Sequence, residues 1–73
     1  MNTVETLIQL ASDLAEGAGD LEVACDIDQA IGSKSPTEMR WSLTNQYPQF
    51  KYSDADLALQ EAERVLNQIR SKR

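Results

Sequence analysis

All four aromatic side chains fall within residues 37–52, and this stretch most constrains how the chain can fold. They are Trp41, Tyr47, Phe50 and Tyr52. Large aromatic residues bury much apolar surface and dominate a small core. The segments on either side contain mainly alanine and aliphatic residues, which need a shared surface to pack on. We therefore expect residues 37–52 to form the centre of the core of one domain that spans residues 1–73.

The first part of this stretch alternates apolar and polar residues. Met39, Trp41 and Leu43 are separated by Arg40 and Ser42. Apolar residues at every second position are typical of a strand with one buried face. We predict a β-strand here, and the alternation alone does not decide whether Trp41 faces the core or solvent.

A second alternation follows after a short polar segment. Phe50 and Tyr52 alternate with Gln49 and Lys51, and Pro48 near the start fits an edge strand, which needs no ladder donor there. Together the two predicted strands form an antiparallel β-hairpin across the whole stretch from 37 to 52. An isolated hairpin is only marginally stable, so this one is expected to pack on helices.

Residues 2–31 have the pattern of a helical hairpin. Apolar residues recur at spacings of three and four, the period of a helix with one buried face. Asn2 is placed to cap the first helix and Asp20 the second, with Gly17 and Gly19 in the turn between them. The apolar residues are Val4, Leu7, Ile8, Ala11, Leu14 and Ala15 in the first helix and Val23, Ala24, Ile27, Ala30 and Ile31 in the second.

The last part of the chain predicts a C-terminal helix over residues 53–70. Ser53 precedes Asp56 by three residues, a spacing typical of a helix N-terminal cap. The apolar face that follows consists of Ala58, Leu59, Ala62, Val65, Leu66 and Ile69. The predicted fold is therefore a small α+β domain of order α-α-β-β-α, in which a two-stranded antiparallel hairpin packs on helices.

The residue types present exclude several kinds of chemistry. The chain contains no histidine and a single cysteine, Cys25. Zinc sites built from His and Cys, and nucleophilic sites that need a His base, are therefore excluded. Asp20, Glu22 and Asp26 lie on different faces of a helix and lack the spacing of a calcium-binding loop. We predict a protein that is not an enzyme and that binds no metal or cofactor.

Charge is distributed unevenly along the chain, whose net charge is −5. No Lys or Arg occurs in residues 1–31, and the acids there are Glu5, Asp13, Glu16, Asp20, Glu22, Asp26 and Asp28. Such an array can dock on a basic protein surface, although blocks of surface acid more often serve only to keep a protein soluble. We predict that Glu16, Asp20, Glu22 and Asp26 bind a protein partner.

A second interpretation is that the aromatic stretch binds a nucleotide or single-stranded nucleic acid. Arg40, Trp41, Lys51 and Tyr52 combine bases with aromatic rings, as in proteins that stack and clamp single strands. Packing of the aromatic side chains in the core explains the same residues without a ligand. The acidic first half also disfavours a phosphate ligand.

Chain length and hydropathy bear on association and location. A chain of 73 residues has a small core, so a self-associating structural or assembly factor, a homo-oligomer, is a third interpretation. No apolar run reaches the roughly 20 residues that cross a membrane, and the N-terminus lacks the basic opening of a signal peptide. We expect a cytoplasmic protein.

Several segments resemble a family of small phage and prophage proteins, the phage ABA-sandwich domains. They are Leu7-Ile8, the run from Asp26 to Gly32 (DIDQAIG), the run from Glu38 to Leu43 (EMRWSL) and the run from Ala55 to Ala62 (ADLALQEA). The resemblance implies an aromatic-rich strand before an Ala- and Leu-rich final helix, and an origin in a phage or prophage. It brings no catalytic residues. With such an origin, the predicted partner is a host protein, and inhibition of a defence or nucleic-acid-handling system is the predicted effect.

Overall fold

The computed structural model describes residues 3–71, and all regular structure in this part of the chain is helical. The elements are α1 (Thr3–Gly17), α2 (Leu21–Ala30), α3 (Pro36–Gln46), the short 3₁₀ helix η1 (Pro48–Phe50) and α4 (Asp54–Ser71). The predicted α+β fold is therefore wrong. The stretch expected to form a β-hairpin folds as α3 and η1, and no strand occurs within the described residues.

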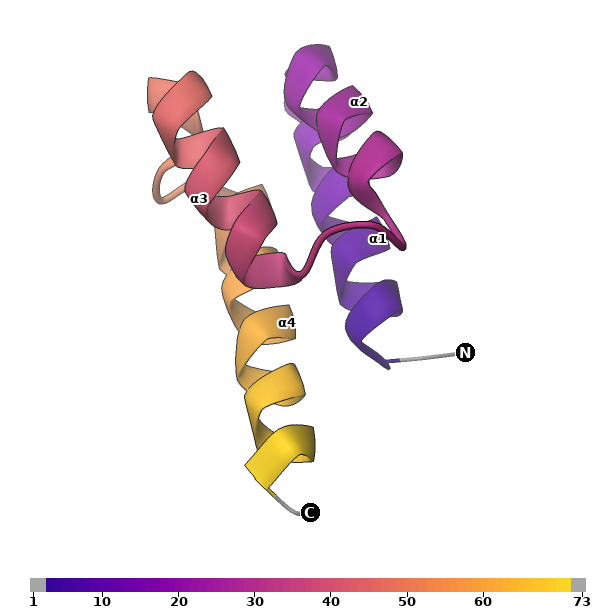
Figure 1. The fold of residues 1–73 in the computed structure, drawn as a ribbon. Helices are drawn as coiled ribbons and strands as arrows, with labels where there is room; N and C mark the ends of the chain where they lie inside the picture. The colour runs from indigo at the N-terminus through magenta and orange to yellow at the C-terminus, as the bar shows by residue number, and fades with distance from the viewer. Residues whose placement is uncertain (1–2, 72–73) are drawn as a thin grey trace.

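The two longest helices, α1 and α4, run antiparallel and form the centre of the fold (Figure 1). α4 packs chiefly on α1, while α2 packs on α1 and α3 packs on α4. α2 and α3 contact each other little. Both are shorter than the central pair, so the C-terminal turns of α4 extend past them at the bottom of Figure 1.

The core consists mainly of alanine and aliphatic side chains. Alanines from both α1 and α4 are buried, and small side chains let two helix axes approach closely. The buried hydrophobic residues are Val4, Ile8, Ala11, Ala15, Val23, Ala24, Ile27, Met39, Leu43, Phe50, Ala55, Ala58, Leu59 and Ala62. Phe50 is the one aromatic side chain in this set. The aromatic stretch therefore does not form the centre of the core.

α2 has the predicted buried face, formed by Val23, Ala24 and Ile27. The predicted cap is only partly right. Asp20 occupies the N-cap position, but its side chain makes no capping hydrogen bond. It accepts instead from Gln49 Nε2 at 3.3 Å, and thus joins the start of α2 to η1.

α3 begins at a capping box formed by Ser35 and Glu38. The Ser35 hydroxyl accepts from the backbone N–H of Glu38 at 3.2 Å, and the Glu38 carboxylate accepts from the Ser35 N–H at 3.3 Å. Pro36 follows in the first turn, where the missing N–H has no helical partner to lose. Met39 and Leu43 are four residues apart and both are buried, a spacing that fits a helix as well as a strand.

The aromatic side chains have unequal environments. Phe50 is buried and Tyr47 is half-buried, whereas Trp41 is 73% exposed and Tyr52 is 75% exposed. Trp41 and Tyr52 therefore face solvent, which corrects the expectation that the aromatic stretch forms the centre of the core. Two residues correspond to a rotation of about 200° around a helix, so burial of Met39 turns Trp41 toward solvent.

α4 begins after Ser53, as the sequence predicts. Ser53 Oγ accepts from the backbone N–H of Asp56 at 3.2 Å and donates to the carbonyl of Phe50 at 2.6 Å. The buried face of α4 narrows toward the C-terminus, where Ile69 is 48% exposed. The predicted cap at Asn2 lies outside the described residues.

Candidate functional site

A buried carboxylate connects α3, the turn before α4, and α4 itself. Asp56 is only 2% exposed. Its Oδ1 accepts from Arg40 Nε at 2.9 Å, and its Oδ2 accepts from the backbone N–H of Tyr52 at 3.0 Å and from Gln60 Nε2 at 3.3 Å. A buried charge is tolerated when it is paired and fully hydrogen-bonded. Asp56 therefore fixes the position from which Arg40 reaches the surface.

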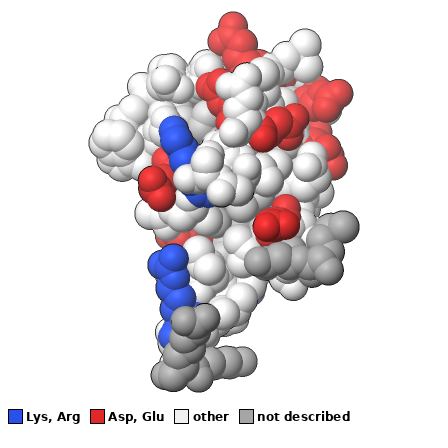
Figure 2. Space-filling view, turned by 45° about the vertical axis from the view of Figure 1, so that its right-hand side comes forward, with Lys and Arg blue, Asp and Glu red and all other residues white. Residues whose placement is uncertain are grey.

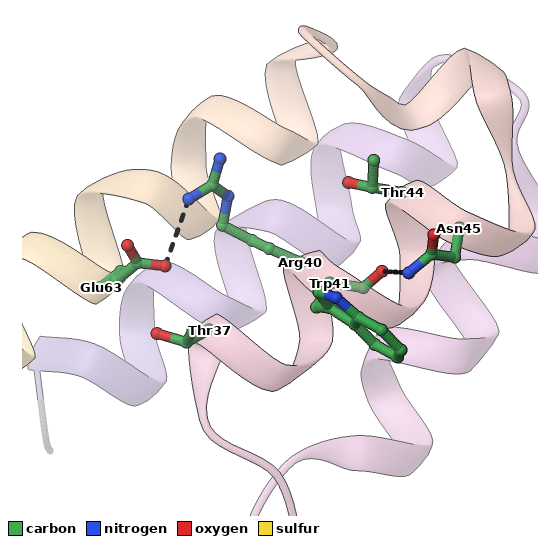
Figure 3. A pocket seen from close by; sticks show the side chains of 6 residues that line it. All are labelled: Thr37, Arg40, Trp41, Thr44, Asn45 and Glu63. Carbon is green, nitrogen blue, oxygen red and sulfur yellow. Dashed lines mark hydrogen bonds and ion pairs between the residues drawn. The ribbon is translucent and has the colours of Figure 1, made fainter.

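Arg40 is held by a second carboxylate on α4. Its Nη1 lies 3.2 Å from Glu63 Oε2 (Figure 3), and the two side chains are 29% and 28% exposed. Partial burial lowers the pKa of the Arg40 guanidinium, but the hydrogen bonds and charges of Asp56 and Glu63 outweigh it, so this pKa lies above its ordinary value. The guanidinium is thus fixed in place, and its charge is balanced by two carboxylates.

Two open hollows flank the Arg40–Glu63 ion pair. One has a volume of about 340 Å³ and is lined by Thr37, Arg40, Trp41, Thr44, Asn45 and Glu63. The other has a volume of about 520 Å³ and is lined by Arg40, Leu57, Gln60, Glu61, Glu63, Arg64 and Asn67. Because Arg40 and Glu63 line both hollows, these residues form one continuous outer face of α3 and α4, which we name the Trp41 surface.

The part of this surface on α3 follows helical spacing. Its residues lie three, four, seven and eight positions after Thr37, which places them on one side of a helix. They are Arg40, Trp41, Thr44 and Asn45. Figure 3 shows the Trp41 ring outside α3 and the Arg40 side chain extending toward Glu63. Asn45 Nδ2 donates to the carbonyl of Trp41 at 2.8 Å.

The sequence analysis found only two residues of this surface, Arg40 and Trp41. The others were not predicted because the segment was expected to form a strand, in which neighbouring residues point to opposite faces. The helical spacing of three and four residues that begins at Thr37 could have identified Thr44 and Asn45 as neighbours of Arg40 and Trp41. Glu63 had no such signal, since its role depends on the packing of α4 beside α3.

The four residues predicted to bind nucleic acid do not form a hairpin, but two of them meet at Asp56. Arg40 binds it through the side chain and Tyr52 through the backbone. Lys51 Nζ lies 5.3 Å from the centroid of the Tyr52 ring, within the range of a cation–π contact. Arg40 is already paired with two carboxylates, so of these four residues only Lys51 offers a charge not balanced by an acid.

The predicted acidic surface is partly engaged within the protein. The Tyr47 hydroxyl donates to Asp26 Oδ2 at 2.7 Å, and Gln49 donates to Asp20. The hydrogen bond to Asp26 and the loss of solvent, together with the charges of Asp26, Glu22 and Asp20, raise the pKa of Tyr47 to about 12. Asp20, Glu22 and Asp26 therefore lie around one hydroxyl that joins α2 to the end of α3.

The remaining predicted acid lies across the turn from this group. Glu16 is exposed near the end of α1, as Glu22 is near the start of α2. Neither side chain has a hydrogen bond or an ion pair with another described residue. Figure 2 shows acidic side chains gathered over the upper and right-hand parts of one face, the side of α1 and α2, with basic side chains toward its left.

Two further observations concern ligands and membranes. Within residues 3–71, no three His, Cys, Asp or Glu side chains lie close enough together to hold a metal ion. None of the helices in that same range is both long and apolar enough to span a membrane. Cys25 is exposed on α2.

Comparison with known proteins gives no relative for this chain. No family model matches it, and neither does any curated protein or any solved structure. The resemblance to phage ABA-sandwich domains therefore stays a hypothesis.

Proposed function

We propose that this chain is a non-enzymatic protein-binding domain that docks its partner on the Trp41 surface. The observation that carries this proposal is the 73% exposure of Trp41, the largest side chain of the protein, on a regular helix. Burying an indole on binding removes much apolar surface from water, and Trp and Arg are the residues most enriched at the energetic centre of protein interfaces.

The surroundings of Trp41 support the same proposal. Arg40 is fixed by Asp56 and Glu63, so little side-chain freedom is lost when a partner covers it. The hollows on either side are open and mix apolar with polar lining, and Leu57 adds a second exposed apolar side chain. Such a surface suits a protein better than a small molecule, which binds in an enclosed pocket.

A nucleic-acid partner is less well supported. Single-strand binding depends on free positive charge beside the stacking rings. Arg40 is neutralised by its two carboxylates, and the chain as a whole carries a charge of −5.

The acidic side of α1 and α2 is a second candidate surface, for a basic host protein. The observation that favours it is the exposure of Glu16 and Glu22 without internal partners, in a half that contains no Lys or Arg. Under this proposal the chain is a phage-type inhibitor in the bacterial cytoplasm. Glu16→Lys together with Glu22→Lys should then abolish binding of the partner, while unchanged binding would eliminate this candidate.

Site-specific photo-crosslinking in bacterial cells tests the Trp41 surface directly. A photoreactive phenylalanine derivative replaces Trp41 in one variant and Leu21 in the control, because Leu21 is also exposed, at 65%, but lies on α2. We expect a protein adduct at position 41 and none at position 21. Absence of a protein adduct at 41, or an equal yield at both positions, would refute the proposal, and an adduct with nucleic acid alone would favour the alternative.

A further inference from the structure

The part of the Trp41 surface on α4 carries opposite charges one helical turn apart. Glu61 and Arg64 form an ion pair with each other, and their side chains are still 45% and 57% exposed. The hydrogen bond from Arg64 lowers the pKa of Glu61, which keeps it ionised. Leu57, four residues before Glu61, is 52% exposed on the same side of the helix.

This order of charges is complementary to itself when α4 is reversed. In a two-fold symmetric contact, residue i of one copy meets residue j of the other, and j meets i. If the axis passes midway between Glu61 and Arg64, each Glu61 faces Arg64 of the other copy. The existing ion pairs then join into a network of four charges, and neither copy has to break its own pair.

The remainder of the molecule directs a second copy to this face. No Lys or Arg occurs in residues 3–31, so two copies that approach through α1 and α2 repel each other. Lys34, Arg40, Lys51, Arg64 and Arg70, the bases of the described residues, all follow α2 in the chain. Contact between α4 helices also keeps the acidic sides of the two copies away from the interface.

Trp41 borders the proposed contact. It lines the same hollow as Glu63, and Glu63 is placed between Glu61 and Arg64 in the sequence of α4. Its indole therefore borders the surface that a second copy would cover, and burial of an exposed aromatic ring contributes to binding.

From these relationships we infer that the protein docked on the Trp41 surface is a second copy of this chain, with the two α4 helices antiparallel across a two-fold axis. This inference rests on the proposed function, since it names the partner of the same surface.

Sedimentation velocity between about 1 μM and about 1 mM tests it. We expect the mass to rise from the 8.1 kDa of one chain toward twice that value. Trp41→Ala should weaken self-association at least about tenfold, whereas Leu21→Ala should leave it unchanged. A single-chain mass over the whole range would overturn the inference.

Charge exchange separates the proposed symmetry from other modes of association. Arg64→Glu and Glu61→Arg should each weaken self-association by about tenfold or more, because like charges then face each other. An equimolar mixture of these two variants should associate again, and so should the double variant, which restores the opposite charges in reverse order. Association that is indifferent to all of these changes would overturn the antiparallel arrangement, and circular dichroism verifies that each variant is folded.

The crosslinking experiment distinguishes failure of this inference from failure of the proposed function. An adduct at position 41 with the chain itself supports both. An adduct only with another protein refutes the second-copy inference and leaves the docking function in place, whereas no protein adduct refutes both.

Discussion

Arg40 on α3 and Tyr52 in the turn before α4 bind opposite oxygens of one buried carboxylate, that of Asp56. The side chain of Arg40 donates to Oδ1 at 2.9 Å and the backbone N–H of Tyr52 donates to Oδ2 at 3.0 Å. Arg40 and Asp56 are 16 residues apart in sequence. Asp56 thus provides a specific polar connection between α3 and α4, and it positions the surface on which Trp41 lies.

Removal of this carboxylate should destabilise the protein strongly. Asp56→Ala leaves the Nε of the partly buried Arg40 and the backbone N–H of Tyr52 without their acceptor, so we expect the free energy of unfolding to fall by about 2–4 kcal/mol. Urea denaturation followed by circular dichroism measures the loss. Glu63→Ala is the matched control, because Glu63 binds the same guanidinium at a more exposed position and should cost less than about 1 kcal/mol. Equal losses in the two variants would contradict a structural role specific to Asp56.

Tyr52 should tolerate glycine better than alanine. Its φ of +66° lies in the left-handed region, which disfavours every residue with a Cβ. Tyr52→Gly should therefore be more stable than Tyr52→Ala, by up to about 1 kcal/mol.

The neighbouring residue supplies the control for that comparison. Lys51 has a φ of −59°, so Lys51→Gly should be less stable than Lys51→Ala. Thermal unfolding of the four variants measures both differences. If glycine were the less stable residue at both positions, the left-handed conformation of Tyr52 would not be a source of strain.

Loss of the capping box should weaken α3. Ser35→Ala removes the acceptor for the Glu38 N–H, and we expect a loss of about 1 kcal/mol in the free energy of unfolding. Ser33→Ala, two residues earlier, removes only a hydroxyl that donates to the carbonyl of Ala30 in an exposed turn, and should cost less. A strand in this segment would show no such difference, because a strand has no N-terminal cap.

The hydrogen bond from Tyr47 to Asp26 should make stability depend on pH in the alkaline range. The pKa of Tyr47 is about 12 in the folded protein and lies near 10 for a free tyrosine. The folded state therefore holds this proton more tightly than the unfolded state. The stabilisation is fully present below pH 10 and is lost as the pH rises through 12.

A pair of tyrosine variants isolates this effect from other groups that titrate at high pH. The wild type should be more stable than Tyr47→Phe at pH 8, and the difference should shrink between pH 10 and pH 12. Tyr52→Phe should show no such convergence, because the Tyr52 side chain is 75% exposed and its hydroxyl makes no hydrogen bond to any residue that the structure describes. Denaturant titrations at several pH values give the comparison, and a constant difference for Tyr47→Phe would contradict the assignment.

The helices on both sides of the aromatic stretch were predictable because their buried residues repeat over several turns. A helical spacing that continues over several turns does not fit a strand. Examples are Val23 and Ile27 in α2, and Leu59 and Ala62 in α4. α3 is different because Met39 and Leu43 satisfy both a strand and a helix. Ser35 and Glu38, with Pro36 between them, decide for the helix, and this local signal was present in the sequence.

The candidate site was less predictable because it depends on packing between α3 and α4. Asp56 looks like an ordinary cap residue in the sequence, and only the tertiary structure buries it beside Arg40. The exposure of Trp41 likewise follows because its segment is a helix, in which burial of Met39 and Leu43 turns Trp41 toward solvent. The expectation that the aromatic stretch forms the centre of the core failed because buried aliphatic side chains and alanines, several of them on α1 and α4, make up most of the core.

Those alanines also limit how the protein can diverge. Ala11 and Ala62 are completely buried, in the two helices that form the centre of the fold. A larger residue at either position overpacks the core unless other side chains change with it. A lineage descended from this chain should therefore keep small residues along α1 and α4, even after its surface, including position 41, has been replaced. Distant homologues would be found by this register of small residues rather than by the tryptophan.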